Sequence, residues 1–260
     1  MRWSRQFTLG AALALCLAGC ASTGLEPGGA QAAHAARQAR RAALGAVKRG
    51  DVWFERKDYE SAVASYGEAI RFDPSWAESY AKRASARQRL QDLDGAIADL
   101  DEAIDLDPTN GVYFNNRGVA WHHKHEEDRA IADYDEAIRL NPADAAAYDN
   151  RGNAWHAKGD DRNALADYDA SLRLNPDSGK AYNNRGNIWY EQGAMDRAIA
   201  DYSEAIRRNP HDAIAYTGRG EAWQEKGDAA RAIADYKAAL RVDPGYMRAR
   251  EALESLHGTL

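Results

Sequence analysis

The sequence predicts an all-α fold, a solenoid of six helix-turn-helix repeats of 34 residues closed by a C-terminal capping helix. The first observation is a proline that recurs every 34 residues, at Pro74, Pro108, Pro142, Pro176, Pro210 and Pro244. The second is that glycine, tryptophan, alanine and tyrosine keep the same step, as in Gly152, Trp155, Ala164 and Tyr168 of the fourth repeat. A fixed period of this length is typical of stacked helical units that bury their apolar faces only against their neighbours.

Each repeat is predicted to be a hairpin of two helices. Tyr148, Gly152 and Trp155 lie on one helical face, the run KGDD then interrupts the pattern, and Ala164 and Tyr168 mark a second face. Proline follows the second helix because it lacks the N–H needed to continue a helix. We expect the small residues of the two helices to face each other, so that the backbones approach closely, while tryptophan and tyrosine fill the space between hairpins.

We call each set of positions that recur every 34 residues a column. The columns resemble the tetratricopeptide repeat, in which small residues, aromatic residues and a late proline follow the same order. The resemblance implies a right-handed superhelix with a concave groove lined mainly by the first helix of each repeat. The repeats are expected at 43–76, 77–110, 111–144, 145–178, 179–212 and 213–246. The second repeat departs from the pattern, with Ala84, Arg87 and Leu100 in the glycine, tryptophan and tyrosine columns, so we expect looser packing there.

Residues 1–19 resemble a bacterial lipoprotein signal peptide. Arg2 and Arg5 give a basic start, residues 7–17 are an apolar run too short to cross a bilayer, and the stretch ends in LAGC at Cys20. The resemblance implies that Cys20 is acylated and anchors the protein in the cell envelope. The residue after it is alanine rather than the aspartate that favours inner-membrane retention, so we expect the outer membrane, facing the periplasm. The alternative is an ordinary secretory signal with a chance cysteine.

The remaining segments are assigned from composition. Residues 20–29 are expected to be the lipidated cysteine and a flexible tether, 30–42 a basic, alanine-rich extension of the first helix, and 247–260 the capping helix and a tail. The basic side chains of the extension are expected either against anionic lipid head groups or on a solvated helix face. The only cysteines are Cys16 and Cys20, which leaves no internal disulfide framework. The net charge of −6, concentrated in the repeats, argues against non-specific nucleic-acid binding.

An arginine stands where the tetratricopeptide repeat usually has a leucine-like residue, and an aspartate departs from the usual choice on the second helix. The predicted structural ion pairs combine Arg83, Arg117, Arg151, Arg185 and Arg219 with Asp99, Asp133, Asp167, Asp201 and Asp235. Arg151 and Asp167 are equally far in sequence from the turn at Gly159, so antiparallel helices place them at nearly one height. We expect carboxylate contacts, within a hairpin or between neighbours. The alternative is an arginine ladder that binds anions in the groove.

Asparagines crowd the first helices of the middle repeats. They are the predicted peptide-binding residues of the groove: Asn115, Asn116, Asn150, Asn153, Asn183, Asn184 and Asn187. A side-chain amide both donates and accepts, so a row of them can pair with the backbone of an extended peptide. The row is similar to the asparagine ladder of O-linked N-acetylglucosamine transferases, which implies the same use. The alternative is that asparagine is only a tolerated polar residue there.

The run WHHKHEE at 121–127 is the other local feature. His122, His123, His125 and His156 are weak candidates for a transition-metal site, although their spacing matches no established motif and solvated histidines are the simpler interpretation. No phosphate loop, zinc-protease motif or nucleophile signature occurs, so we predict no enzyme activity and no cofactor.

The sequence therefore predicts a lipid-anchored, non-enzymatic scaffold that binds a partner protein or extended peptide. Its architecture resembles that of lipoprotein adaptors that hold peptidoglycan hydrolases or assist pilus and secretin assembly. Two alternatives remain open: a self-assembling structural lipoprotein, and a lipoprotein that binds a metal or glycan.

Overall fold

The computed structural model describes residues 27–257, and this part of the chain contains helices and no strand. The helices are α1 (Pro27–Glu55), α2 (Tyr59–Phe72), α3 (Ala77–Arg89), α4 (Leu93–Leu106), α5 (Gly111–His123), α6 (Glu127–Leu140), α7 (Ala145–Ala157), α8 (Asp161–Leu174), α9 (Gly179–Glu191), α10 (Met195–Arg208), α11 (Ala213–Glu225), α12 (Ala229–Val242) and α13 (Met247–His257). The predicted all-α repeat fold is confirmed. The signal peptide and Cys20 lie outside the described residues. Helix α1 begins at Pro27, so the last three residues of the predicted tether are helical.

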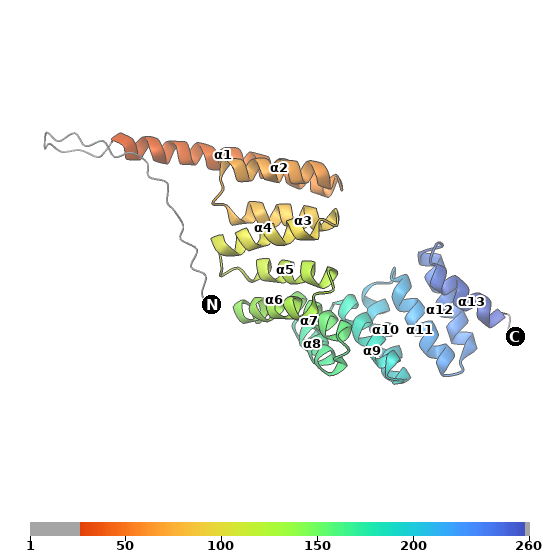
Figure 1. The fold of residues 1–260 in the computed structure, drawn as a ribbon. Coiled ribbons are helices and arrows are strands. Elements are labelled where there is room, and N and C mark those ends of the chain that lie inside the picture. Colours follow the sequence, from red (N-terminus) through yellow and green to blue (C-terminus); the bar gives the residue numbers. More distant parts are fainter. Residues whose placement is uncertain (1–26, 258–260) are drawn as a thin grey trace, which may run out of the picture.

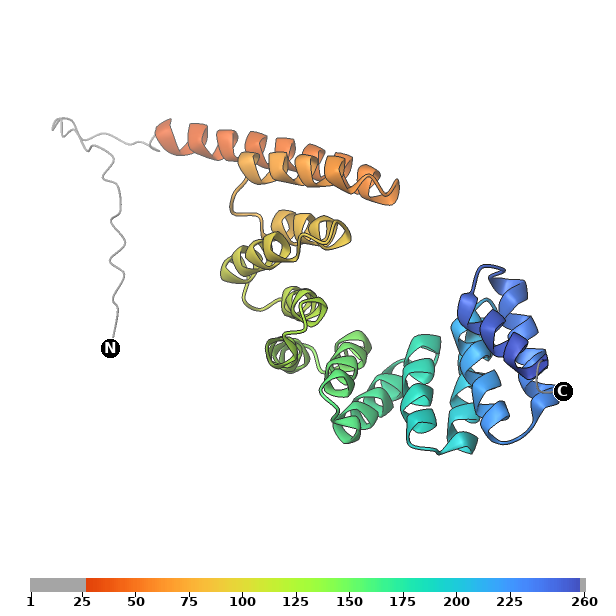
Figure 2. The same ribbon diagram turned by 45° about the vertical axis from the view of Figure 1, so that its right-hand side comes forward.

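Consecutive helices pair into six hairpins that stack in chain order, with α13 packed on α12 at the end (Figure 1). Each second helix also packs on the first helix of the next hairpin. The stack curves, so that α1 and α13 lie at the two ends of an open arc (Figure 2). First helices of neighbouring hairpins contact each other from α3 to α13, and no comparable contact joins second helices in the described part of the chain. The first helices therefore line the inner side of the curve.

Local sequence sets the helix ends. The side chains of Asp58, Asp92, Asp160 and Asp228 each accept a hydrogen bond from the backbone N–H three residues on, which caps α2, α4, α8 and α12. The turn before each second helix needs a positive φ, which glycine adopts without strain. Gly159, Gly193 and Gly227 supply it in the last three repeats, whereas Lys57, Gln91 and His125 take φ values of 60 to 63° in the first three.

In five of the six hairpins the core is a glycine on the first helix against a tyrosine ring on the second. A Cβ added to Gly152 would lie 2.9 Å from Cε1 of Tyr168, and the tyrosines of this column are at most 2% exposed. The glycine thus meets the tyrosine ring of its own hairpin rather than alanine alone. In the second repeat Ala84 and Leu100 replace the pair, and both are fully buried. The added methyl group of alanine accompanies a smaller partner, so this pair is closed to solvent like the others, and the expected looser packing of the second repeat stays a prediction.

The two ends of the stack differ. Helix α13 is the predicted capping helix, and its Ala249 is fully buried against α12. At the other end, residues 31–38 of α1 are exposed and extend beyond α2. Within the described residues no helix combines the length and apolar character that crossing a bilayer requires.

Candidate functional site

The predicted arginines and aspartates lie together inside each hairpin. Each arginine donates from Nε and Nη2 to the two carboxylate oxygens of the aspartate 16 residues later, at 2.6 to 2.9 Å. The pairs are Arg83–Asp99, Arg117–Asp133, Arg151–Asp167, Arg185–Asp201 and Arg219–Asp235. The aspartates are buried and the arginine side chains are 20 to 23% exposed. Such bidentate pairs fix both geometry and charge.

A second set of acceptors joins neighbouring hairpins, and the sequence reasoning missed it. The remaining Nη1 of Arg117, Arg151 and Arg185 donates to an exposed aspartate on the preceding second helix. These aspartates are Asp101, Asp135 and Asp169, at 2.5 to 2.6 Å. Each of the three guanidiniums thus bridges two carboxylates. Hydrogen bonds to the buried aspartates raise the pKa of these arginines above its already high usual value, so they stay charged.

The arginines also lie over a column of aromatic rings. The guanidinium carbon is 5.5 to 5.8 Å from the ring centroid of the residue three positions earlier. The rings belong to Tyr80, Phe114, Tyr148, Tyr182 and Tyr216. The constant spacing of three residues was a readable signal for this contact. With two carboxylates and a ring as neighbours, the middle arginines have little capacity left for an external anion, which removes the basis of the anion-ladder alternative.

Most of the predicted asparagines bind one another between repeats. Asn150 donates to Asn115 at 3.1 Å, and Asn184 donates to Asn153 at 2.9 Å. The Tyr168 hydroxyl also donates to Asn153, at 2.7 Å. These amides stabilise the contact between hairpins, so they offer less to a peptide than an open ladder would. Asn187 is similarly engaged, because it accepts from the Tyr202 hydroxyl at 2.8 Å.

Asn116 and Asn183 differ from the other asparagines. Asn116 contributes its backbone carbonyl, which accepts from Gln88 at 2.8 Å, and its side chain is half-buried. Asn183 is only 9% exposed, and its Oδ1 is buried with no hydrogen-bond partner in the described residues. A buried polar atom left unpaired costs about 1 to 3 kcal/mol, so this amide is the place where an incoming donor would gain most.

Asn183 lines a pocket of about 480 Å³ between α9 and α11. Asn184 and Lys180 lie on the same wall, and the opposite wall carries Arg208 and Ile214. Ile214 is 50% exposed although it is a large apolar residue. The pocket therefore combines an apolar surface with amide side chains and charged groups of both signs, and the unpaired oxygen of Asn183 is buried beside it.

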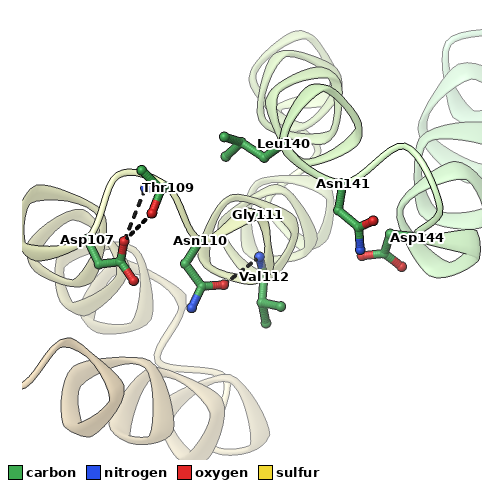
Figure 3. A pocket seen from close by; sticks show the side chains of 8 residues that line it. All are labelled: Asp107, Thr109, Asn110, Gly111, Val112, Leu140, Asn141 and Asp144. Atoms are coloured by element: carbon green, nitrogen blue, oxygen red, sulfur yellow. Dashed lines mark hydrogen bonds between the residues drawn. The ribbon is translucent and has the colours of Figure 1, made fainter.

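An equivalent pocket of about 360 Å³ lies two repeats earlier, between α5 and α7. Its apolar residues are Leu140 and Val112, and Val112 is 54% exposed. Figure 3 shows the carboxylates of Asp107 and Asp144 on either side of Val112. Asp107 accepts from the backbone and hydroxyl of Thr109, and Asn110 caps α5 through the N–H of Val112. Because the pockets occupy equivalent positions along the inner side, one extended chain could contact both.

The candidate histidines are not gathered in one place. His122 contacts Glu127 through Nδ1 at 2.6 Å, and the centroid of its ring lies 6.1 Å from that of His123. His125 takes a φ of 60° in the turn before α6, so its position serves the backbone. These three histidines form no cluster of metal ligands in the described residues.

His156 belongs to a different group. Its possible ligand atoms and those of Asp161 and Glu191 lie within 4.8 Å of one another. Nδ1 of His156 faces Asp161 at 2.8 Å and Nε2 faces Glu191 at 3.7 Å, so the two carboxylates meet different ring nitrogens. Both carboxylates therefore already have a partner in the ring, and a group of this kind is common on protein surfaces without a metal ion.

Models of the tetratricopeptide repeat family match most of the repeat region. One model covers 157–213 and 196–246, a second covers 50–91 and 126–159, and a third covers 77–110. No curated protein matches the sequence.

Solved structures share the fold at low sequence identity. A PilF structure from Pseudomonas aeruginosa is 20% identical, with a TM-score of 0.71 over 82% of this chain and 97% of that one. PilW, described as a widely conserved type IV pilus biogenesis factor, is 21% identical, with a TM-score of 0.72 over 82% and 97%. YrrB, described as a TPR protein with an unusual peptide-binding site, is 20% identical, with a TM-score of 0.56 over 73% and 97%.

Proposed function

Since tetratricopeptide repeats fill residues 50–110 and 126–246 of this chain, we propose that it is a non-enzymatic scaffold that binds a partner polypeptide on the inner face of the solenoid. Proteins built from these repeats generally serve protein–protein interaction. The finer proposal is that the partner enters as an extended segment across the middle and later repeats, and that the scaffold is held at a membrane through Cys20.

The single observation that carries the binding proposal is the unpaired, buried Oδ1 of Asn183. This oxygen is closed to solvent, so a peptide N–H would reach it only after the Asn183 side chain rotates toward the pocket, and the unsatisfied acceptor would then gain a hydrogen bond. If the amide is rotated by half a turn, it presents its NH₂ group to a peptide carbonyl instead, so either orientation suits a backbone.

The apolar residues of the two pockets support an extended occupant. Val112 and Ile214 are each at least half exposed on the inner side, and each lies in a pocket bordered by polar groups. Apolar side chains of a bound segment would fill the pockets, and its backbone would meet the asparagines between them. The chemistry favours a polypeptide with apolar residues spaced apart, rather than a small ligand.

The anchor proposal is supported by the lipoprotein-like signal that ends at Cys20. Several acyl chains on one cysteine would give stable attachment. We place the protein in the bacterial envelope, at the outer membrane facing the periplasm. YrrB, with its peptide-binding site, and the pilus proteins PilF and PilW share the fold, which makes an adaptor role in an envelope assembly a reasonable analogy.

In-cell crosslinking with mass spectrometry tests the binding proposal. The pocket variant carries Val112→Arg and Ile214→Arg, which block both pockets from exposed positions. A matched control carries Ala132→Arg and Ala234→Arg, which add the same charge at exposed positions on second helices. We expect partner proteins to be lost from the pocket variant alone, with circular dichroism unchanged in both. Identical partner profiles for wild type and the pocket variant would overturn the proposal.

A further inference from the structure

The first helix of the stack has a packing face that nothing in the described chain covers. Val52 is 46% exposed, whereas its counterparts in the later repeats are fully buried against the preceding hairpin. These counterparts are Ala86, Ala120, Ala154, Ile188 and Ala222. Since α1 has no preceding hairpin, this face is open. It carries a hollow of about 340 Å³ lined by Lys48, Arg49, Val52 and Trp53.

The open face continues along α1 as a stripe of basic and apolar residues. Arg37, Arg41, Leu44, Lys48 and Val52 are separated by three or four positions, so they follow one side of the helix. All five are exposed, with Leu44 at 44%. We call these five residues the basic stripe. Glu55 lies beyond its far end, toward the turn into α2.

The charges of the basic stripe are not used inside the protein. Arg40 turns to the other side of α1, where it pairs with Asp73 at 2.8 Å and lies over Trp76. Arg49 pairs with Glu68 at 2.5 Å. In contrast, Arg37, Arg41 and Lys48 form no ion pair with any described residue. Helix α1 has five basic and two acidic residues, whereas the whole chain has a net charge of −6. The net charge of this helix is therefore opposite in sign to that of the rest of the chain.

We propose that the basic stripe lies on the surface of a bilayer that contains anionic phospholipid. Basic side chains interleaved with leucine and valine are the features of helices that bind in the lipid interface. The inference rests on the proposed anchor for its geometry. Cys20 precedes Pro27 by seven residues, so an acyl chain there would hold the start of α1 within about 25 Å of the bilayer. Repulsion of the acidic repeats would orient the solenoid away from the surface.

A second copy of the chain fits this face less well. Inside the stack, the face of a first helix is covered by a second helix. The opposite end of the solenoid presents α13, which occupies the place of a first helix and is not followed by a second one in the described residues. Two copies stacked end to end would therefore not reproduce the contact that covers Val52's counterparts.

The test uses the full chain, recovered from membranes and reconstituted into vesicles of phosphatidylcholine with or without phosphatidylglycerol. A Leu44→Cys substitution supplies a reporter thiol, because the sequence has no cysteine after Cys20. Ala166→Cys, exposed on α8, is the matched control. The measurement is the rate of reaction with a water-soluble maleimide. We expect the thiol at position 44 to react more slowly when phosphatidylglycerol is present, and the thiol at 166 to react equally in both vesicles.

Neutralising the stripe should reverse the protection. Arg37→Gln, Arg41→Gln and Lys48→Gln remove three charges, each worth about fivefold in binding at an anionic surface, so the binding constant of the stripe should fall roughly a hundredfold. Equal rates at position 44 in the two vesicles would overturn the proposal. Protection that rises with protein concentration rather than with phosphatidylglycerol would also overturn it, in favour of a second copy.

A flotation assay separates failure of the stripe from failure of the anchor. Protein that floats with pure phosphatidylcholine vesicles is held by its anchor whatever the stripe does. If the protein floats only with vesicles that contain phosphatidylglycerol, and position 44 is protected there, the proposal for the basic stripe stands and the proposal of a lipid anchor is wrong. Val52→Cys is a second reporter if Leu44→Cys perturbs folding.

Discussion

Arg151 and Asp167 face each other across one hairpin and share two parallel hydrogen bonds, 2.8 Å from Nε and 2.7 Å from Nη2. The third donor, Nη1, reaches Asp135 of the preceding hairpin at 2.5 Å. One side chain therefore fixes both the closure of its own repeat and its junction with the previous one. The arginine column is accordingly part of the fold.

Removing the buried partner of this pair should cost much more than removing the exposed one. Asp167→Ala leaves the Arg151 guanidinium, which is 20% exposed, without its buried partner. We expect the free energy of unfolding to fall by about 2 to 3 kcal/mol, which is below the range for a fully buried pair. Asp135→Ala, the matched control, removes a partner that is 56% exposed and should cost less than about 1 kcal/mol. Urea denaturation followed by circular dichroism measures both. Equal losses would mean that burial does not set the strength of the pair.

The positive φ of His125 predicts a stabilising substitution. A side chain at a φ of 60° is strained, so His125→Gly should raise stability by about 1 kcal/mol. Gly159 occupies the equivalent turn at a φ of 79°, and Gly159→His should lower stability by a similar amount. Thermal denaturation of the two variants provides the comparison. A loss of stability in His125→Gly would show that the histidine side chain does more than occupy the turn.

The glycine and tyrosine columns should be energetically coupled. Gly152→Ala places a Cβ 2.9 Å from the Tyr168 ring and should cost about 1 to 3 kcal/mol through overpacking. Combining it with Tyr168→Leu recreates the alanine and leucine pair that is fully buried at Ala84 and Leu100. A double-mutant cycle should therefore give a double variant more stable than the sum of the single losses predicts. Simple additivity would argue against direct coupling.

Five buried tyrosines predict a loss of stability at alkaline pH. Burial raises the pKa of Tyr66, Tyr134, Tyr168, Tyr202 and Tyr236. Because the folded-state pKa exceeds the unfolded one, this contribution is complete below the ordinary tyrosine pKa of about 10 and is lost as the pH rises above it. Tyrosinate absorbance from these residues should appear together with the loss of helical circular dichroism. Ionisation of all 13 tyrosines near pH 10 with the helices intact would contradict the burial.

The sequence predicted which residues of one hairpin lie at the same height, although it left open whether each arginine pairs within its hairpin or with a neighbour. The placement of Arg151 opposite Asp167 required only an antiparallel pair of helices and a central turn at Gly159. Contacts between hairpins were harder to predict, because the spacing of residues within one repeat does not give the angle at which repeats stack. Asp135 was therefore missed, and Asn150 was expected to face a peptide although it binds Asn115 of the neighbouring repeat.

The pairing of residue sizes in the second repeat was also not predicted. Looser packing was expected at Ala84 from that column alone, whereas the structure buries Ala84 together with Leu100, so the two positions change size together. The unpaired oxygen of Asn183 was not predictable as a single residue either. Its burial depends on the chain folded around it.

Site-specific photocrosslinking in cells tests the central claim most directly. A photoreactive residue at position 214 lies in the pocket beside Asn183, and one at position 166 lies on the exposed face of α8. The account predicts crosslinks to another protein from position 214 and few from position 166. Strong crosslinks from position 166 with none from position 214 would contradict it and would place the interaction surface on the second helices.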